Sequence, residues 1–203
     1  AAGGISYEGV YVHSGTGFTL RTNELDGSFQ ENSKGTVGIC AENTGSENNW
    51  IEDNTFETLT IGGEGAGLNH GADEVFGLRF QCNTSLFLNN PGSANDLELG
   101  TDYFITPPGI ATMQGSAQQA AGNKFDDITD DGFIDGENIR NIGAQINYFW
   151  FDAPNQEPDE VINTELFEVD EDGENECLFG TDGCIDCEFT DGELDNKKSQ
   201  FYI

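Results

Sequence analysis

The sequence predicts an all-β protein that winds as a parallel β-helix of about four to five coils, with an asparagine at one corner of each coil. Three observations support this prediction. Two residue patterns recur along the chain, each repeat carries two short runs of alternating apolar and polar residues, and no repeat shows the 3.6-residue period of a helix. The 27 glycines supply the tight turns that short strands require.

The first recurring pattern centres on an asparagine. An apolar residue lies three positions before it, and a second one lies two positions after it in three repeats, whereas Ser85 takes that place in the third repeat. The spacings between the asparagines are 31, 29 and 40 residues, counted from 23 to 54, to 83 and to 123. The four members are Asn23, Asn54, Asn83 and Asn123.

The second pattern is a glycine followed by an apolar residue, with glycine spacings of 29, 29 and 42 residues. Both patterns therefore place an insertion before the last repeat, and a period between about 20 and 50 residues indicates a repeat architecture. Asparagine tolerates unusual backbone angles and its amide bonds backbone groups, so we expect the asparagines to form stacked, mutually bonded corners. The glycine pairs are Gly9-Val10, Gly38-Ile39, Gly67-Leu68 and Gly109-Ile110.

These segments resemble the right-handed parallel β-helix modules of large secreted bacterial surface proteins, many of which are exported by the type IX secretion route. The resemblance implies a right-handed helix, a location outside the cell or on its surface, and a role in adhesion, ligand display or an extracellular fibre. It implies no shared catalytic motif. It covers most of residues 5–151, through the segments 9–27, 36–59, 77–90, 114–128 and 146–151.

The composition excludes several classes of partner. Acidic residues number 38 and basic residues 7, and the formal net charge of −31 opposes binding to nucleic acid or to anionic membranes. No apolar run approaches the roughly 18 residues of a membrane span, and residues 1–4 lack the features of a signal peptide. We expect a mature product or a piece of a longer protein, and the start near Gly4-Ile5 is close to the repeat phase, as though earlier coils preceded it.

The predicted organisation has two parts, with a β-helix at 1–151 and an acidic, cysteine-containing cap or linker at 152–203. Residues 89–108 are predicted to be an inserted loop that rejoins the helix at Gly109. The aromatic strand 146–151, or the segment that follows it, is expected to close the C-terminal end, because an exposed end of a solenoid must be covered. The predicted coils are 5–27, 28–56, 57–88 and 109–151.

An acidic loop around Gly132 matches most of the calcium-binding loop of an EF-hand, and calcium is the one cofactor that the sequence suggests. The last position holds an asparagine where a bidentate glutamate is usual, and flanking helices are not evident, so a solvated acidic turn is the alternative. The candidate ligands are Asp127, Thr129, Asp131, Phe133, Asp135 and Asn138.

Five cysteines leave at least one without a partner in the chain. Measured from the nearest corner asparagine, Cys40 and Cys82 fall in different columns, so we predict that they do not pair and that each is a small buried residue. Cys177, Cys184 and Cys187 are predicted to contain a local disulfide, and the sequence does not determine which two of them pair.

No residue set predicts catalysis. His13 and His70 are interpreted as solvated histidines, because the sequence places no acid that could orient them. Arg21 and Arg79 stand at different distances from their asparagines and are expected to face different sides. The nearest pairs of carboxylates for a hydrolase are Glu52-Asp53 and Asp126-Asp127, and neither stands out.

Two functional classes remain. The first is a non-enzymatic surface module, whose partners are other copies of itself, neighbouring domains of a longer chain, or glycans. The second is an enzyme that binds or degrades polysaccharides, which would need a groove with two facing carboxylates or a clustered arginine–aspartate pair. One exposed strip of outward aromatic residues, drawn from Tyr7, Tyr11 and Trp50, would favour the binding class.

Overall fold

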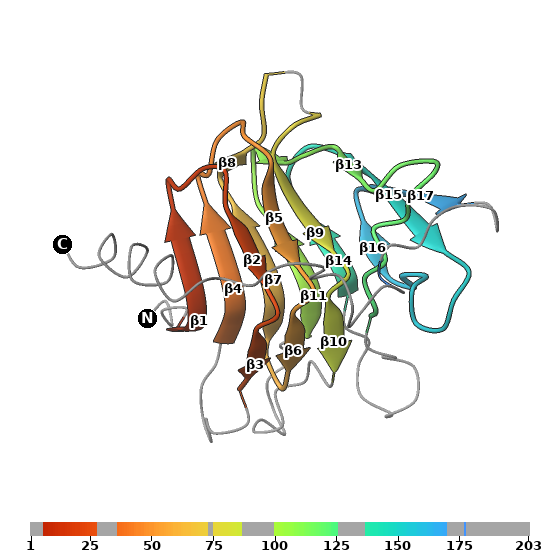
Figure 1. The fold of residues 1–203 in the computed structure, drawn as a ribbon, viewed down its shortest axis with the longest axis horizontal. Coiled ribbons are helices and arrows are strands. Elements are labelled where there is room, and N and C mark those ends of the chain that lie inside the picture. The colour runs from red at the N-terminus through yellow and green to blue at the C-terminus, as the bar shows by residue number, and fades with distance from the viewer. Residues whose placement is uncertain are drawn as a thin grey trace, which may run out of the picture.

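The computed structural model describes residues 6–27, 36–72, 75–86, 100–125 and 137–169, together with Cys177. Within these ranges the protein is all-β, with no α-helix, and every strand pair in its sheets is parallel (Figure 1). The all-β prediction is therefore confirmed for the described residues. The described residues therefore include no helix that is long and apolar enough to cross a membrane.

The largest sheet has six parallel strands, in the order β1-β4-β7-β11-β14-β16. Its members follow one another along the chain, their first residues lie 24 or more positions apart, and each joins the sheet beside its predecessor (Figure 1). The strands are β1 (Ser6–His13), β4 (Thr36–Glu42), β7 (Ile61–Ala66), β11 (Thr101–Ile105), β14 (Glu137–Asn141) and β16 (Val161–Ile162).

The strands that lie between successive members of the large sheet along the chain, together with β17, form four smaller sheets. One joins β2 (Thr19–Arg21), β5 (Asn49–Glu52) and β9 (Leu78–Gln81), and a second joins β3 (Glu24–Asp26), β6 (Thr55–Glu57) and β10 (Thr84–Leu86). A third joins β13 (Met113–Gln114), β15 (Ile146–Phe151) and β17 (Thr164–Val169), and a fourth joins β8 (Leu68–Asn69) and β12 (Gly109–Ile110).

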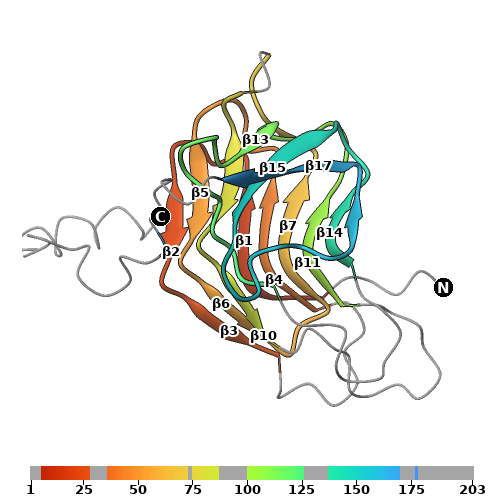
Figure 2. The same ribbon diagram turned by 90° about the vertical axis from the view of Figure 1, so that its right-hand side faces the viewer.

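We use the word passage for a stretch of chain that begins at or just before one strand of the large sheet and runs until the next such strand. The first three passages are 6–27, 36–59 and 60–86, and each runs from the large sheet to the β2-β5-β9 sheet and then to the β3-β6-β10 sheet. Seen from the side, the large sheet faces these smaller sheets across a shared interior (Figure 2). The later passages begin at β11, β14 and β16.

The core lies in this interior and draws on every sheet, with Ile39, Ile51, Phe56 and Ile110 among its fully buried members. Aromatic rings run through it from passage to passage. Phe80 stacks on Tyr103 with ring centroids 4.6 Å apart, Tyr103 meets Phe125 edge-on at 6.0 Å, and Phe125 meets Tyr148 at 5.7 Å. Such ring pairs add stabilisation beyond the area that they bury.

The glycine pattern was assigned to the wrong register in the third repeat. Ile39 pairs with Gly63, so the glycine beside Gly38 is Gly62 and not Gly67. The column is a close backbone approach, because a Cβ at Gly38 would lie 2.6 Å from the Gly62 carbonyl oxygen. Residues 70–77, which lie between β8 and β9, lengthen the third passage after the large sheet, and the spacing of 29 therefore combined two different columns.

The predicted insertion was also wrong in its extent. The chain rejoins the large sheet at Thr101 rather than at Gly109, because 101–105 is β11, paired with β7 on one side and β14 on the other. The candidate strand at 96–99 lies outside the described residues.

The aromatic strand 146–151 is not the terminal strand, so closure of the C-terminal end by the segment that follows it is the part of the prediction that stays open. As β15 it pairs with β13 on one side and with β17 on the other, so it is an internal strand. The parallel sheets continue past the predicted boundary at residue 151 as far as Val169, because β16 and β17 pair with β14 and β15. Part of the predicted acidic segment therefore belongs to the sheets, because 164–169 forms strand β17.

Candidate functional site

The four predicted corner asparagines form a continuous hydrogen-bonded ladder. The Oδ1 atom of Asn54 accepts the backbone N–H of Asn23 at 3.0 Å and its Nδ2 at 2.8 Å. Asn83 accepts the same two groups of Asn54 at 3.0 and 2.9 Å, and Asn123 accepts those of Asn83 at 2.9 and 3.1 Å. The prediction that these residues stack and bond one another is confirmed.

The same amides also bind the passage before them. Nδ2 of Asn54 donates to the Leu20 carbonyl at 3.0 Å, and Nδ2 of Asn83 donates to the Ile51 carbonyl at 2.8 Å. Asn54, Asn83 and Asn123 are buried, so each amide replaces water for the backbone groups at its corner. One side chain thus satisfies groups on both neighbouring passages.

The unusual backbone angles at this corner belong to the residue before each asparagine. Thr22, Asp53, Cys82 and Gly122 have φ values of 57°, 55°, 56° and 68°. The expectation that the asparagine itself adopts the strained conformation is wrong. Its task is to hold the turn through its amide, while its neighbour takes the left-handed geometry.

The ladder has a direction and two different ends. Every link runs from a donor in the earlier passage to Oδ1 in the later one. At the first end, no described residue donates to Oδ1 of Asn23, whose own Nδ2 donates to Asn54 and to the Arg21 carbonyl. At the last end, Nδ2 of Asn123 donates to the hydroxyl of Tyr148 at 3.1 Å, so a tyrosine takes the place of a fifth asparagine.

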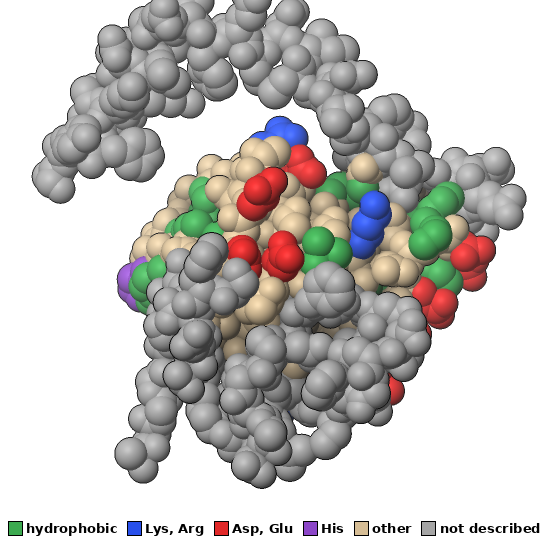
Figure 3. Space-filling model, turned by 90° about the horizontal axis from the view of Figure 1, so that it is seen from below, with side chains coloured by type: hydrophobic (Ala, Val, Ile, Leu, Met, Phe, Trp, Pro, Cys, Tyr) green, Lys and Arg blue, Asp and Glu red, His purple; other side chains and the backbone are tan. Residues whose placement is uncertain are grey.

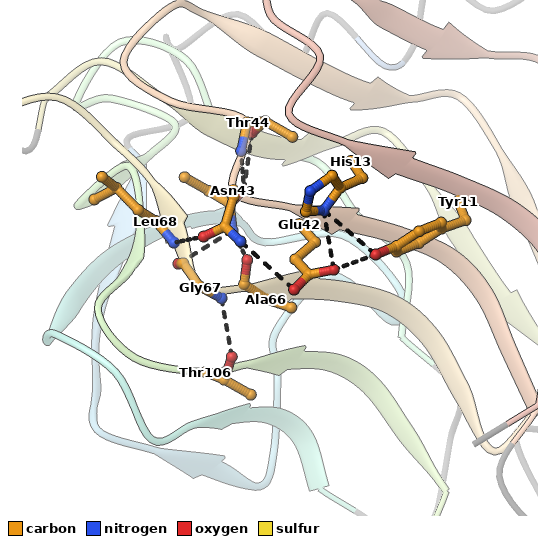
Figure 4. A network of polar contacts seen from close by, with 10 residues as sticks. Tyr11, His13, Glu42, Asn43, Thr44, Ala66, Gly67, Leu68 and Thr106 are labelled. Carbon is orange, nitrogen blue, oxygen red and sulfur yellow. Dashed lines mark hydrogen bonds and ion pairs between the residues drawn. The ribbon is translucent and has the colours of Figure 1, made fainter. Parts of the chain in front are cut away.

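A polar cluster lies on the outer face of β1 and β4 (Figure 4). The Tyr11 hydroxyl donates to the Glu42 carboxylate, and Nδ1 of His13 lies 3.2 Å from the same oxygen. The hydrogen bond to Glu42 is the main cause that raises the pKa of Tyr11 to about 12. The bonds from Tyr11 and then His13 hold the pKa of Glu42 below its ordinary value.

This acid beside His13 was missed because it comes from the next passage. The parallel register sets Tyr11 against Cys40 and His13 against Glu42, a pairing that the periodicity alone did not specify. All three side chains lie at the surface, and Tyr11 is 48% exposed. The cluster contains no nucleophilic hydroxyl beyond the phenol, so its chemistry is that of a surface hydrogen-bonded network.

Arg21 and Arg79 share one outer face, contrary to the prediction. The register of the β2-β5-β9 sheet aligns Thr19 with Trp50 and Arg79, and aligns Arg21 with Glu52 and Gln81. Because side chains alternate between the two faces of a strand, residues two and four positions before the asparagine point to the same side. The Arg79 guanidinium lies 5.0 Å from the Trp50 ring, and Arg21 lies 3.7 Å from Glu52.

Tyr11 and Trp50 do not form the aromatic strip that would favour the binding class, because these residues lie on different sheets. Trp50 instead lies under Arg79, whose Nη2 donates to the Val75 carbonyl at 3.1 Å. Val75 and Phe76 are 43% and 48% exposed in the segment between β8 and β9, which projects at the top of Figure 1. The side chain of Tyr7 lies outside the described residues.

The face formed by β3, β6 and β10 is acidic. The register of these strands aligns Asp26 with Glu57 and Leu86, and Glu24 is exposed beside Asp26. Seen from below, acidic side chains gather on the described part of the surface, with few basic ones among them (Figure 3). This arrangement accounts for part of the high charge without bringing two carboxylates to face each other across a groove.

Two groups with reactive chemistry are buried in the large sheet. Cys40 and Glu64 are 1% and 4% exposed and lie side by side on β4 and β7. Burial raises the pKa of the Glu64 carboxyl, and a hydrogen bond with Cys40 partly offsets it. Oε2 of Glu64 has no hydrogen-bond partner among the described residues. A buried carboxyl of this kind favours its neutral form.

The calcium prediction falls mostly outside the described residues, which do not include Asp127, Thr129, Asp131, Phe133 or Asp135. Asn138 is described and is buried in β14. Its Nδ2 donates to Asp102 at 2.8 Å, and its Oδ1 accepts the backbone N–H of Asp159 at 2.8 Å. The amide oxygen proposed as the twelfth ligand is therefore engaged within the sheet.

The cysteine predictions have mixed outcomes. Cys40 and Cys82 do not pair, as predicted. Cys82 is not a simple buried thiol, however, since it forms a disulfide with Cys177 across 95 residues. Cys177 therefore takes no part in a local disulfide, and a bond between the other two cysteines of the cluster stays a prediction. Cys184 and Cys187 lie outside the described residues.

The remaining candidates do not gather into a second site. His70 is half-buried, with Nδ1 2.7 Å from the Gly71 carbonyl, so it is not the solvated histidine that the sequence predicted. Glu52 pairs with Arg21, and Asp53 holds the corner turn. In the parts of the chain that the structure describes, no three histidine, cysteine or acidic residues are placed to hold a metal ion. Asp126 and Asp127 lie outside those parts.

Comparison of the chain with protein-family models, with curated proteins and with solved structures finds no match. The geometry of the corner ladder, the outer faces and the disulfide is therefore the basis for any functional conclusion.

Proposed function

We propose that the chain is a right-handed parallel β-helix module of a secreted bacterial surface protein of the kind exported by the type IX route. In this proposal its role is adhesion or ligand display, not catalysis. The observation that carries the proposal is the ladder that joins Asn23, Asn54, Asn83 and Asn123. A ladder of this kind suits a solenoid whose passages stack along one axis, because each passage contacts only its neighbours.

Two further observations support this role. The outer faces carry exposed or half-buried polar and aromatic groups in fixed rows, as in the Thr19–Trp50–Arg79 row, and rows on a scaffold of paired strands suit recognition. The Cys82–Cys177 disulfide fits an oxidising location outside the cytosol. Calcium binding by the acidic loop at 127–138 is retained as part of the proposal for the residues other than Asn138.

A polysaccharide-binding or polysaccharide-degrading enzyme is the second candidate. The face with Arg21, Trp50 and Arg79 favours the binding half of this idea, because guanidinium groups and an indole ring can contact acidic sugars. Degradation of a polysaccharide has less support than binding. Glu52 is paired with Arg21, and the described faces bring no second carboxylate opposite it.

The test measures binding and turnover on one panel of acidic and neutral polysaccharides, with calcium and then with chelator. Binding that persists without release of reducing ends is expected. Release of reducing ends would establish the enzymatic alternative, and a complete lack of binding would remove glycan display. Light scattering and electron microscopy on the same samples report assembly into fibres, and a dependence on calcium would implicate the acidic loop.

A further inference from the structure

Among the described residues, one polar acceptor of the first passage receives no hydrogen bond. In each of the three links of the ladder, Oδ1 of the later asparagine accepts two hydrogen bonds from the asparagine of the preceding passage, at 2.8–3.1 Å. Asn23 stands at the same corner and in the same orientation, since its own donors reach Asn54. Its Oδ1 receives no donor from the described residues, and by the direction of the other links it is the acceptor that a preceding passage would use.

The apolar layer of the first passage is incompletely covered in the same direction. Val10 pairs with Ile39, Leu20 with Ile51 and Leu25 with Phe56, so the members of each pair occupy one column of the core. The second-passage members are fully buried. The first-passage members are only half-buried, although they pack against the core. Half-covered apolar groups favour contact with a further apolar layer.

The strands of the first passage are also sheet edges. Within the described residues β1, β2 and β3 each pair with one strand only, β4, β5 and β6 respectively. An unpaired strand edge presents backbone N–H and C=O groups that can pair with another strand. Backbone edges, an apolar layer and one oriented amide acceptor therefore coincide at one end of the molecule, on the red strands of Figure 1.

The far end of the described structure does not complement this surface. The ladder stops at Asn123, whose Nδ2 donates to Tyr148 instead of to another asparagine. Tyr148 in turn stands opposite Leu166 of β17, so the last described passage brings no amide to this column. A second copy that approached with its last described strands would leave Oδ1 of Asn23 without a donor.

We propose that the end formed by β1, β2 and β3 is a docking surface for one more parallel passage that has an asparagine at its corner and is supplied by a neighbouring β-helix module of the same surface protein. This inference rests on the proposed function. The incoming asparagine donates its backbone N–H and its Nδ2 to Oδ1 of Asn23, and the incoming apolar side chains cover Val10, Leu20 and Leu25.

The test adds such a passage to the full chain. A second copy of residues 36–59 is placed directly before Ser6, in place of residues 1–5. The register equates Tyr7 with Val37 and Val37 with Ile61, so this junction copies the natural connection from Leu59 to Thr60. Amide hydrogen exchange measured by mass spectrometry then compares β1, β2 and β3 in the parent chain and in the extended chain.

We expect exchange in β1–β3 to slow by about tenfold or more in the extended chain, because each new hydrogen bond and the added apolar contact oppose local opening. The matched control changes the asparagine in the added copy, at the position equivalent to Asn54, to alanine, and it should lose most of this protection. Asn23→Ala should also reduce the exchange protection of β1–β3 by a larger factor in the extended chain than in the parent chain.

Three outcomes would overturn the inference. The first is an added passage that exchanges like an unfolded chain while β1–β3 remain unchanged. The second is equal protection with and without the added asparagine, which would make the corner amide irrelevant. The third is head-to-tail association of the unmodified chain that protects β1–β3, since the far end would then suffice. None of these depends on glycan binding or turnover, so the proposed function can fail while the docking surface stands.

Discussion

At the scale of single residues, the acidity of Tyr11 depends on a carboxylate from the next passage. The Glu42 carboxylate accepts a hydrogen bond from the Tyr11 hydroxyl, and this bond is the main cause that raises the pKa of Tyr11 to about 12. Glu42→Gln removes the negative charge, so the pKa of Tyr11 should fall towards its ordinary value of 10.0. Nuclear magnetic resonance titration of the labelled tyrosine ring carbons measures the change.

The matched control for Tyr11 is Glu52→Gln, which removes a carboxylate on a different sheet and should leave the Tyr11 titration unchanged. A Tyr11 pKa that stays near 12 in Glu42→Gln would contradict the assignment of its cause.

The raised pKa of Glu64 leads to a prediction of how the free energy of unfolding depends on pH. Burial raises its pKa, so between the unfolded value of about 4.5 and the folded value the native state holds a proton that the unfolded chain has lost. Its contribution to the free energy of unfolding is therefore complete below the unfolded pKa and is lost as pH rises through the folded pKa. Glu64→Gln should be less sensitive to pH across this window.

Urea unfolding at a series of pH values measures the Glu64 effect, and Glu57→Gln is the control because Glu57 is exposed on another sheet. If Glu64→Gln and the parent chain lose stability in parallel as pH rises, the carboxyl is ionised in the folded protein and the argument fails.

At the scale of elements, the corner ladder should make interior asparagines more important than the terminal one. Asn54→Ala removes the acceptor of two bonds from Asn23 and the donor of bonds to Leu20 and Asn83. We expect a loss of roughly 2–4 kcal/mol in the free energy of unfolding, because backbone groups at a buried corner are left unpaired. Asn23→Ala should cost about 1 kcal/mol, since nothing described depends on its acceptor.

Chemical denaturation measures both variants, and Asn48→Ala serves as the control at an exposed position outside the ladder. Equal losses for Asn23→Ala and Asn54→Ala would show that the ladder does not distribute stability as its bonds suggest.

The element scale also shows what the sequence could predict. The asparagine column was correct because one residue type meets a geometric need at every passage, and its spacing survives changes elsewhere. The glycine column failed because Gly62 and Gly67 lie five residues apart, and only backbone contact tells them apart. The shared face of Arg21 and Arg79 followed from strand alternation, which was applied to the offsets incorrectly.

At the scale of the whole molecule, the Cys82–Cys177 disulfide encloses a sequence separation of 95 residues. In the chain-entropy model, closing a loop of this length lowers the entropy of the unfolded state by an amount worth about 4–5 kcal/mol. Cys82→Ser should therefore lower the free energy of unfolding by about that amount. Reductant should lower the parent chain to a similar value and should leave Cys82→Ser unchanged, as measured by urea unfolding.

The disulfide and the Tyr11–Glu42 contact were beyond sequence analysis for a common reason. Each joins residues whose proximity depends on how passages register across loops of unequal length, as the 24-residue and 29-residue separations at Thr36–Thr60 and Asn54–Asn83 show. Local patterning determined which residues form strands and which alternate faces. It did not determine which outward side chains from different passages meet.

The disulfide also sets how the molecule responds to mechanical load. When the two ends of the chain are pulled apart, force passes across the sulfur bridge, and the segment between Cys82 and Cys177 is bypassed. At about 3.5 Å of contour per residue, this segment hides roughly 330 Å of chain from extension until the bridge is reduced. Under such a load the chain lengthens only through the residues on the outer sides of the bridge, 1–82 and 177–203, and the strands from β10 to β17 stay unloaded until the bridge is reduced.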